Sequence, residues 1–232
     1  MTTIADRLAV VNERIRSACE RSDRDPATVT LVAVAKTFPA DAVVAAVDAG
    51  ATDIGENRAQ ELTEKAAVIA RAVRWHFIGH LQSNKVRQVV GVASLIHSVD
   101  RFGVAEAIAR RANALELTQD VLIEVNIAGE ASKTGIEPTR AASLADEVAA
   151  LEGVRVRGVM SMPPVTDDPE GARPYLGALA ALGADIAARI EGATEVSMGM
   201  THDLEVAVEE GATLVRVGEA IFGPRNANRR TR

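Results

Sequence analysis

The chain has 232 residues with 26 basic and 32 acidic side chains, which gives a formal net charge of −6. This mild acidic balance and an aromatic content of 3% argue against nucleic acid as the main partner. The single cysteine, Cys19, excludes a disulfide framework, and no run of 18 apolar residues is present to span a membrane. The mixed-charge N-terminus does not have the pattern of a signal peptide, so we expect a cytoplasmic globular protein.

Hydrophobic spacing predicts strands and helices in alternation after a first helix over residues 4–19. The predicted strands cover residues 28–36, 53–55, 74–78, 95–99, 120–127, 154–160, 195–197 and 213–217. The helices between them cover residues 40–49, 58–71, 83–90, 101–114, 139–151, 169–190 and 202–210.

Strands that alternate with helices are typical of parallel pairing with right-handed crossovers. Eight such units predict an α/β fold, a closed (β/α)8 TIM barrel with an extra N-terminal helix, formed as one domain by residues 1–225. The basic residues 226–232 are expected to form a disordered tail. An open doubly wound sheet is the alternative, although no Gly-x-Gly-x-x-Gly follows the first strand.

Lys36 ends the first predicted strand in register with Val32 and Val34. In a barrel this position lies at the C-terminal mouth, and the side chain points inward if those valines do. Partial desolvation of an inward lysine lowers its pKa, and a neutral amine is the form that makes a Schiff base with an aldehyde. A strand-end lysine that only reaches solvent is the alternative, and position alone does not decide between the two.

The loops after the seventh and eighth strands contain glycine, in the sequences SMGMT (197–201) and VGE (217–219). In barrels these two loops frequently form a phosphate site, to which the hydroxyls of Ser197 and Thr201 would add donors. Tight-loop glycines followed by helix caps are the alternative. Arg216 lies within the eighth strand, where it either pairs with a carboxylate in the barrel or presents its guanidinium to a ring nitrogen.

The histidines do not predict a metal site. His76 and His80 are four residues apart on a strand and a loop, which is not a helical zinc signature. His97 and His202 are predicted to be structural. The polar loop over residues 126–135 is either a mobile lid over the mouth or a plain solvated loop.

Together these residues resemble the YggS/PROSC-type pyridoxal 5′-phosphate (PLP) homeostasis proteins, over nearly the whole chain. The matching motifs are VAVAKT (32–37), GEN (55–57), WHFIGHLQSNK (75–85), SKTGI (132–136), RGVM (157–160), SMGM (197–200) and RVGEAIFG (216–223). Thr201 and His202 stand where many relatives have a serine followed by an acid, and we expect Thr201 to keep the hydroxyl role.

The resemblance implies a fold-type III barrel like the N-terminal domain of alanine racemase, with PLP held as a Schiff base on Lys36. It implies that Arg216 faces the pyridine nitrogen and that Asn57 and Met160 line the cofactor. It implies phosphate contacts at Ser197, Met200, Thr201, Gly218 and Glu219, and a secondary PLP-handling lysine at Lys133. It also implies a monomeric carrier or buffer in PLP homeostasis without an established catalytic reaction, whose partners are PLP, free amino acids and PLP-dependent apoenzymes.

The alternative function is an amino-acid racemase of the alanine racemase type. A two-base racemase needs a second base opposite the lysine, which alanine racemase supplies as a tyrosine on an extra β-domain. The single tyrosine here, Tyr175, lies in the helix after the sixth predicted strand, and the chain stops soon after the eighth. A cation at the ring nitrogen makes the ring a poorer electron sink, which suits a carrier, although racemases of this fold share that arrangement. A Schiff-base aldolase barrel is a third possibility, but its lysine typically lies mid-sequence.

Overall fold

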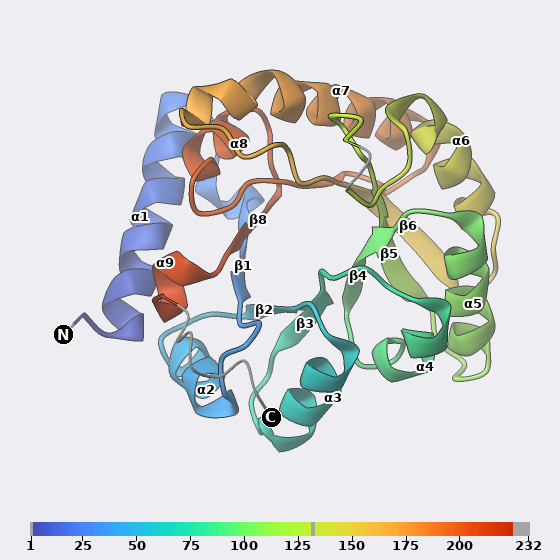
Figure 1. Cartoon of the computed structure of the whole chain (residues 1–232), viewed down its shortest axis with the longest axis horizontal. Helices are drawn as coiled ribbons and strands as arrows, with labels where there is room; N and C mark the ends of the chain where they lie inside the picture. The colour runs from blue at the N-terminus through green and yellow to red at the C-terminus, as the bar shows by residue number, and fades with distance from the viewer. Residues whose placement is uncertain (1, 131–132, 225–232) are drawn as a thin grey trace.

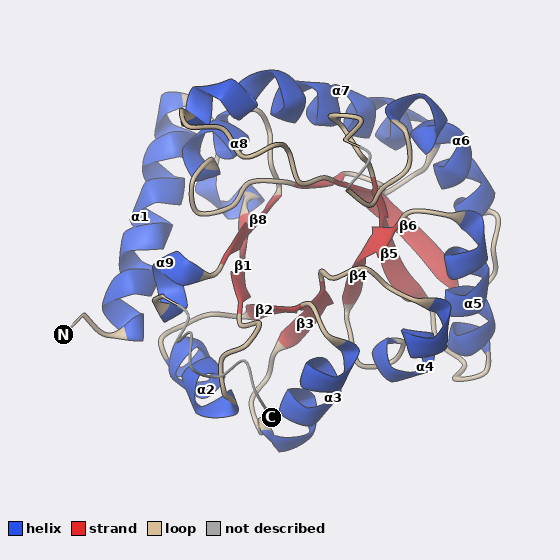
Figure 2. Cartoon of the chain, in the orientation of Figure 1, coloured by secondary structure: helices blue, strands red, loops and turns tan. Residues whose placement is uncertain are grey.

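The computed structural model describes residues 2–130 and 133–224, and it shows a closed barrel of eight parallel strands in chain order (Figures 1 and 2). The strands are β1 (Thr30–Val34), β2 (Asp53–Glu56), β3 (Arg74–Phe77), β4 (Leu95–Val99), β5 (Gln119–Glu124), β6 (Val154–Met160), β7 (Glu195–Ser197) and β8 (Leu214–Val217). Pairing of β1 with β8 closes the ring. The predicted (β/α)8 barrel is confirmed and the open-sheet alternative is wrong. The expected tail over residues 226–232 lies outside the described residues.

The helices form a ring around the barrel (Figure 2). They are α1 (Ile4–Arg21), α2 (Ala40–Asp48), α3 (Ala59–Val68), α4 (Val86–Val89), α5 (Phe102–Asn113), α6 (Pro138–Ala149), α7 (Arg173–Arg189), α8 (Leu204–Glu209) and α9 (Glu219–Phe222). Short 3₁₀ turns precede β1 and the helices α4 and α7. Among the described residues, no helix has the length and apolar character needed to cross a membrane.

The helix predicted over residues 202–210 begins two residues later, at Leu204. The backbone N–H of Met200 donates to Oδ1 of Asp203 at 2.7 Å. This side-chain bond closes a local turn just before the helix, in which Asp203 occupies the N-cap position.

The extra helix α1 is amphipathic and covers the seam where the barrel closes. Thr3 caps it, and the capping box is completed by Asp6. Its buried face is made of Leu8, Val11, Ile15, Ala18 and Cys19. This face packs against α2, α8 and α9, which follow β1, β7 and β8 (Figure 1).

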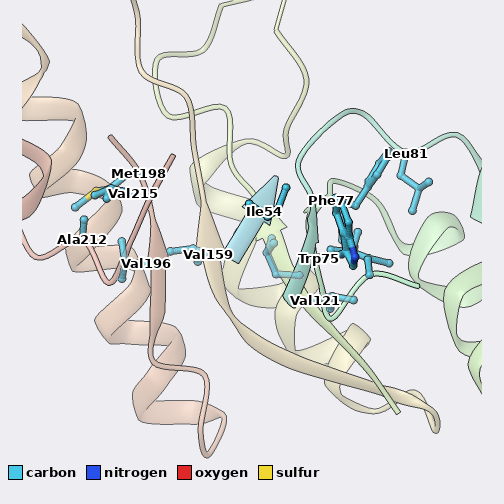
Figure 3. Packing of buried hydrophobic residues seen from close by; sticks show 14 of the residues in the cluster. Ile54, Trp75, Phe77, Leu81, Val121, Val159, Val196, Met198, Ala212 and Val215 are labelled. Carbon is cyan, nitrogen blue, oxygen red and sulfur yellow. The ribbon is translucent and has the colours of Figure 1, made fainter. Parts of the chain in front are cut away.

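The alternation of side chains along each strand builds two separate layers of core. Outward-facing residues such as Ile54, Trp75 and Val215 pack between the strands and the helix ring (Figure 3). The inward-facing apolar residues form their own cluster, which consists of Val32, Leu95, Leu122, Met160 and Leu214. The same alternation directs a set of polar side chains into the barrel interior, and these polar side chains position the candidate site.

Candidate functional site

Lys36 lies two residues beyond the end of β1, at the C-terminal mouth, and its side chain is half-buried. The β1–β2 register pairs Val34 with Gly55, so Lys36 and Asn57 follow the ends of neighbouring strands. The next residue, Thr37, has a φ of 70°, which is uncommon for a residue with a Cβ. Its N–H donates to Oε2 of Glu61 at 3.0 Å. The chain therefore turns sharply directly after the lysine, and α3 holds that turn.

A buried ion pair beneath this turn links the ends of β1 and β2. Nζ of Lys65 contacts the Glu56 carboxylate and also donates to the carbonyl oxygen of Ala35 at 3.0 Å. Burial raises the pKa of Glu56 to about 7, although the bond from Lys65 opposes this shift. The residues tied together are the immediate neighbours of Lys36 and Asn57, so the pair fixes both strand ends.

Asn57 presents a polar group that lacks a protein partner. Its Oδ1 is buried and accepts no hydrogen bond from residues 2–130 or 133–224. A buried, unsatisfied acceptor at the mouth of a barrel is the kind of group that a ligand satisfies. The backbone of Asn57 is also tightly packed, since a Cβ added at Gly79 would come within 2.1 Å of its carbonyl oxygen.

We predict that Gly79→Ala lowers the free energy of unfolding by about 1–3 kcal/mol, because the new methyl group overlaps the Asn57 carbonyl and has to push the strand end aside. Thermal denaturation of the cofactor-free protein measures the change. Gly103→Ala is the matched control, since nothing lies within 4 Å of a Cβ there and the position is helical. Equal melting temperatures for the two variants would contradict the close approach at Gly79.

The two loops expected to bind phosphate follow β7 and β8 at the same mouth as Lys36. Gly199 in the first has a φ of 87°, and a Cβ there would lie 2.5 Å from that of Ala207. Met200 and Thr201, which follow it, are half-buried. In the second loop Gly218 caps the short helix α9, of which Glu219 is the first residue.

Two arginines of α1 hold these loops from outside the barrel. Arg14 donates through Nη2 to the carbonyl oxygen of Thr201 at 2.9 Å and forms an ion pair with Glu205 at 2.6 Å. Arg7 donates through Nε to the carbonyl oxygen of Ile221 at 2.6 Å. The extra helix thus supports both loops directly.

Arg216 is buried in the barrel interior, with 4% of its surface exposed. Its guanidinium donates to the carbonyl oxygen of Ser161 at 2.8 Å and to the hydroxyl of Ser197. Burial lowers the pKa of Arg216 to about 10, and the carboxylates of Asp203 and Glu124 oppose the shift. The side chain therefore remains a cation at neutral pH.

The Ser197 hydroxyl has two side-chain partners inside the barrel. It is fully buried, and its partners are Arg216 and Nδ1 of His97, the latter at 2.9 Å. Because Ser197 occupies an inward position on β7, its side chain faces the barrel interior and holds Arg216. The expected phosphate contact of Ser197 stays a prediction.

The remaining predicted residues lie at two places. Met160 is buried inside the barrel and pairs in register with Ser197. Lys133 lies in the loop after β5, where Nζ is 2.8 Å from Oε1 of Glu130 and donates to the carbonyl oxygen of Pro163 at 3.1 Å. Its amine therefore bridges the loops after β5 and β6. Residues 131 and 132 lie outside the described residues, and the second of them is the first residue of the SKTGI motif.

A group that the sequence analysis missed lies on the far side of the mouth from Lys36. Ligand-type atoms of His80, Asp100 and Glu124 lie within 4.8 Å of one another at the ends of β3, β4 and β5. Burial raises the pKa of Glu124, and its Oε2 has no hydrogen-bond partner in the described parts of the chain. The three residues come from separate strand ends, so no local spacing signals them. The expectation of no metal site, which considered only His76 and His80, stays a prediction.

Comparison with known proteins first identifies the class of protein to which this fold belongs. The family model "Alanine racemase, N-terminal domain" matches residues 7–226, in agreement with the closed barrel. A pyridoxal phosphate homeostasis protein of Aquifex aeolicus is 42% identical over 222 residues, covering 95% of this chain and 97% of the relative.

Comparison with solved structures leads to the same family. A protein of Bifidobacterium adolescentis, described as unknown, superposes with a TM-score of 0.89 at 39% identity and covers 94% of both chains. PipY of Synechococcus elongatus, solved with PLP bound, gives a TM-score of 0.80 at 33% identity, covering 92% of this chain and all of that one. The chain belongs to the family of pyridoxal phosphate homeostasis proteins.

Proposed function

We propose that this chain binds PLP at the C-terminal mouth of its barrel, as a Schiff base on Lys36, and acts in the cell as a PLP carrier or buffer without catalytic turnover. The observation that carries the proposal is the buried cation Arg216 on β8, the strand that pairs directly with the lysine strand β1. PLP supplies an aldehyde, which condenses with an amine and releases water, and a pyridine ring that can withdraw electrons.

The residues at the mouth fit this cofactor. Lys36 supplies the amine, and the turn at Thr37 directs the chain away beyond it. Asn57 supplies an unsatisfied acceptor, and Met160 closes the barrel beneath the site. We assign the phosphate to Met200, Thr201, Gly218 and Glu219 in the two glycine-containing loops, with Ser197 acting through Arg216. Lys133, in its bridge between two loops, remains a candidate for a secondary role in PLP transfer.

Arg216 keeps a positive charge beside the proposed ring position, and this charge disfavours protonation of the pyridine nitrogen and electron withdrawal, which suits a carrier. Racemases of this fold share the arrangement, so the position of Tyr175 is the feature that separates the two functions. Tyr175 lies on α7, in the outer helix ring, and not at the mouth.

Titration of the purified protein with PLP tests the proposal. We expect a visible absorption band, saturation at one PLP per chain, and after borohydride reduction a pyridoxyl adduct on the peptide that contains Lys36. A protein that takes up no PLP would overturn the proposal. Robust conversion of single L-amino acids to their D-isomers would instead favour the racemase. Transfer to apoenzymes, a monomeric state and a cytoplasmic location belong to the same proposal, and mixing loaded protein with an apoenzyme tests the first.

We predict that Arg14→Met weakens PLP binding about three- to tenfold, because the loop after β7 loses the hydrogen bond to the Thr201 carbonyl and the ion pair to Glu205. The measurement is the dissociation constant from the visible titration. Arg16→Met is the matched control, since this arginine lies on the same helix and its ion pairs within the described residues are with Glu13 and Glu20 of α1 itself. An equal change in the dissociation constant for both variants would contradict a specific role of Arg14 in supporting the loop after β7.

A further inference from the structure

A continuous line of hydrogen bonds runs through the barrel interior from Asp53 to Arg216. Oδ1 of Asp53 lies 2.9 Å from Nε2 of His76, and Nδ1 of His76 lies 2.9 Å from Nε2 of His97. Nδ1 of His97 lies 2.9 Å from the hydroxyl of Ser197, to which Arg216 donates. All five side chains are at least 95% buried. The line, which we call the interior chain, links residues of β2, β3, β4, β7 and β8.

The two ends of the interior chain set the direction of its protons. Arg216 can only donate and the Asp53 carboxylate can only accept. If both imidazoles are neutral, a single arrangement satisfies every bond. In this arrangement the hydroxyl of Ser197 donates to Nδ1 of His97, Nε2–H of His97 donates to Nδ1 of His76, and Nε2–H of His76 donates to Asp53. The lone pairs of the Ser197 oxygen are then left for Arg216.

The surroundings support a neutral His97. Burial lowers the pKa of His97 well below its ordinary value, and the charge of Arg216 acts in the same direction. Burial disfavours ionisation of Asp53, but bonds from His76, Arg74 and Thr52 outweigh it and hold the pKa of that carboxyl well below its ordinary value. Arg74 contributes two of these bonds, at 2.7 and 2.6 Å. The interior chain therefore begins at a fixed anion and ends at a buried cation.

The two ends lie at opposite faces of the barrel. Asp53 begins β2, and together with His76 it lines a cavity of about 210 Å³ at the N-terminal face. Arg74, Asp120 and Glu195 also line this cavity. Arg216, near the end of β8, lies toward the mouth that holds Lys36. The proposed carrier function gives the interior chain no other role.

We propose that Asp53, His76 and His97 are positioning residues that act through Ser197 to hold Arg216 in place, so that the state of the bound cofactor is set partly from the opposite end of the barrel. This inference rests on the proposed function, because Arg216 matters here as the group beside the pyridine ring. Hydrogen bonds in a low-dielectric interior polarise one another, which is how a change at Asp53 reaches the guanidinium.

The first experiment needs no cofactor. Spectra of protein labelled with ¹⁵N-histidine report the protonation and tautomer of each ring, and His80→Gln and His202→Gln identify the two rings outside the interior chain. At neutral pH we expect His97 to be neutral, with its proton on Nε2, where it donates to His76. A proton on Nδ1 of His97, or a charged His97, would overturn the proposed direction.

The second experiment compares Asp53→Asn with Asp120→Asn in PLP titrations. Asp120 lines the same cavity and is also bound by an arginine, Arg155 at 2.6 and 3.0 Å, but it does not belong to the interior chain. We expect Asp53→Asn to shift the visible band and to raise the dissociation constant about three- to tenfold, the equivalent of one hydrogen bond. Asp120→Asn should leave both unchanged.

A comparison of His97→Leu with His97→Gln tests whether the hydrogen bonds of His97 position Arg216 or whether the His97 ring only fills space in the barrel. Leucine removes both hydrogen bonds, whereas glutamine keeps a donor and an acceptor, so we expect glutamine to restore part of the band position. Unchanged spectra and affinity in folded Asp53→Asn and His97→Leu would overturn the inference while leaving PLP binding intact. Absence of a band in the unmodified protein would overturn the proposed function instead, and the ¹⁵N spectra would still test the interior chain.

Discussion

Replacing Lys36 with alanine is expected to abolish the visible absorption of bound PLP and the borohydride-fixed adduct. Without the amine no covalent bond to the aldehyde forms at the mouth, and only the phosphate and ring contacts remain. We expect the dissociation constant to rise at least about tenfold. The melting temperature of the cofactor-free protein should change little, because Lys36 is half-buried at a strand end and contributes little to the core.

Two other lysines serve as controls for this result. Lys85 is exposed beside α4, and Lys133 lies in the loop after β5. Lys85→Ala should bind PLP like the unmodified protein, and Lys133→Ala should keep the band on Lys36. Mass mapping of the reduced adduct to a lysine other than Lys36 would contradict the assignment.

Arg216→Glu is expected to produce the second large effect, a red shift of the visible band together with a lower melting temperature. The carboxylate replaces a cation by an anion beside the ring position, which favours protonation of the pyridine nitrogen. It also removes the bonds to Ser161 and Ser197, and we expect a loss of about 3–5 kcal/mol in the free energy of unfolding. Absorption spectra and thermal denaturation of the same samples measure both.

Arg216→Gln separates charge from stability in this experiment. The amide can keep one bond to the Ser197 hydroxyl but carries no charge, so its spectrum should move less than that of the glutamate variant. If both variants fold and retain the original band, Arg216 does not face the cofactor ring and the proposed orientation is wrong.

Much of the fold was predictable because each strand and helix carries its own periodic signal. The apolar run that ends at Lys36 placed this residue at the C-terminal mouth of the barrel, and Lys36 lies two residues beyond the end of β1. The predicted boundaries differ from the observed ones by a few residues, as at α8, which begins at Leu204. The bond from the Met200 N–H to Asp203 lies just before this helix, and nothing in the hydrophobic pattern reports it.

The interior of the site was not predictable in the same way. His97 was correctly expected to be structural, but its partner Ser197 is 100 residues away and on a strand that does not neighbour β4. Contacts across a barrel depend on how the ring closes and on the stagger of its strands, which no local pattern contains. The support of the Thr201 loop by Arg14 is equally remote in sequence. Inward parity does mark Asp53, His76 and His97 as polar residues facing the interior.

Closure of β1 on β8 has a consequence for when the protein becomes functional. The lysine strand is the first to leave the ribosome, whereas Arg216 and Gly218 belong to the last strand and the loop after it. Under the proposed assignment, a nascent chain therefore has no complete PLP site until the last strand of the barrel is synthesised, and it gains the capacity to bind PLP when the ring closes. Because a ligand that requires the closed ring also stabilises it, PLP supply would influence how much newly made chain survives.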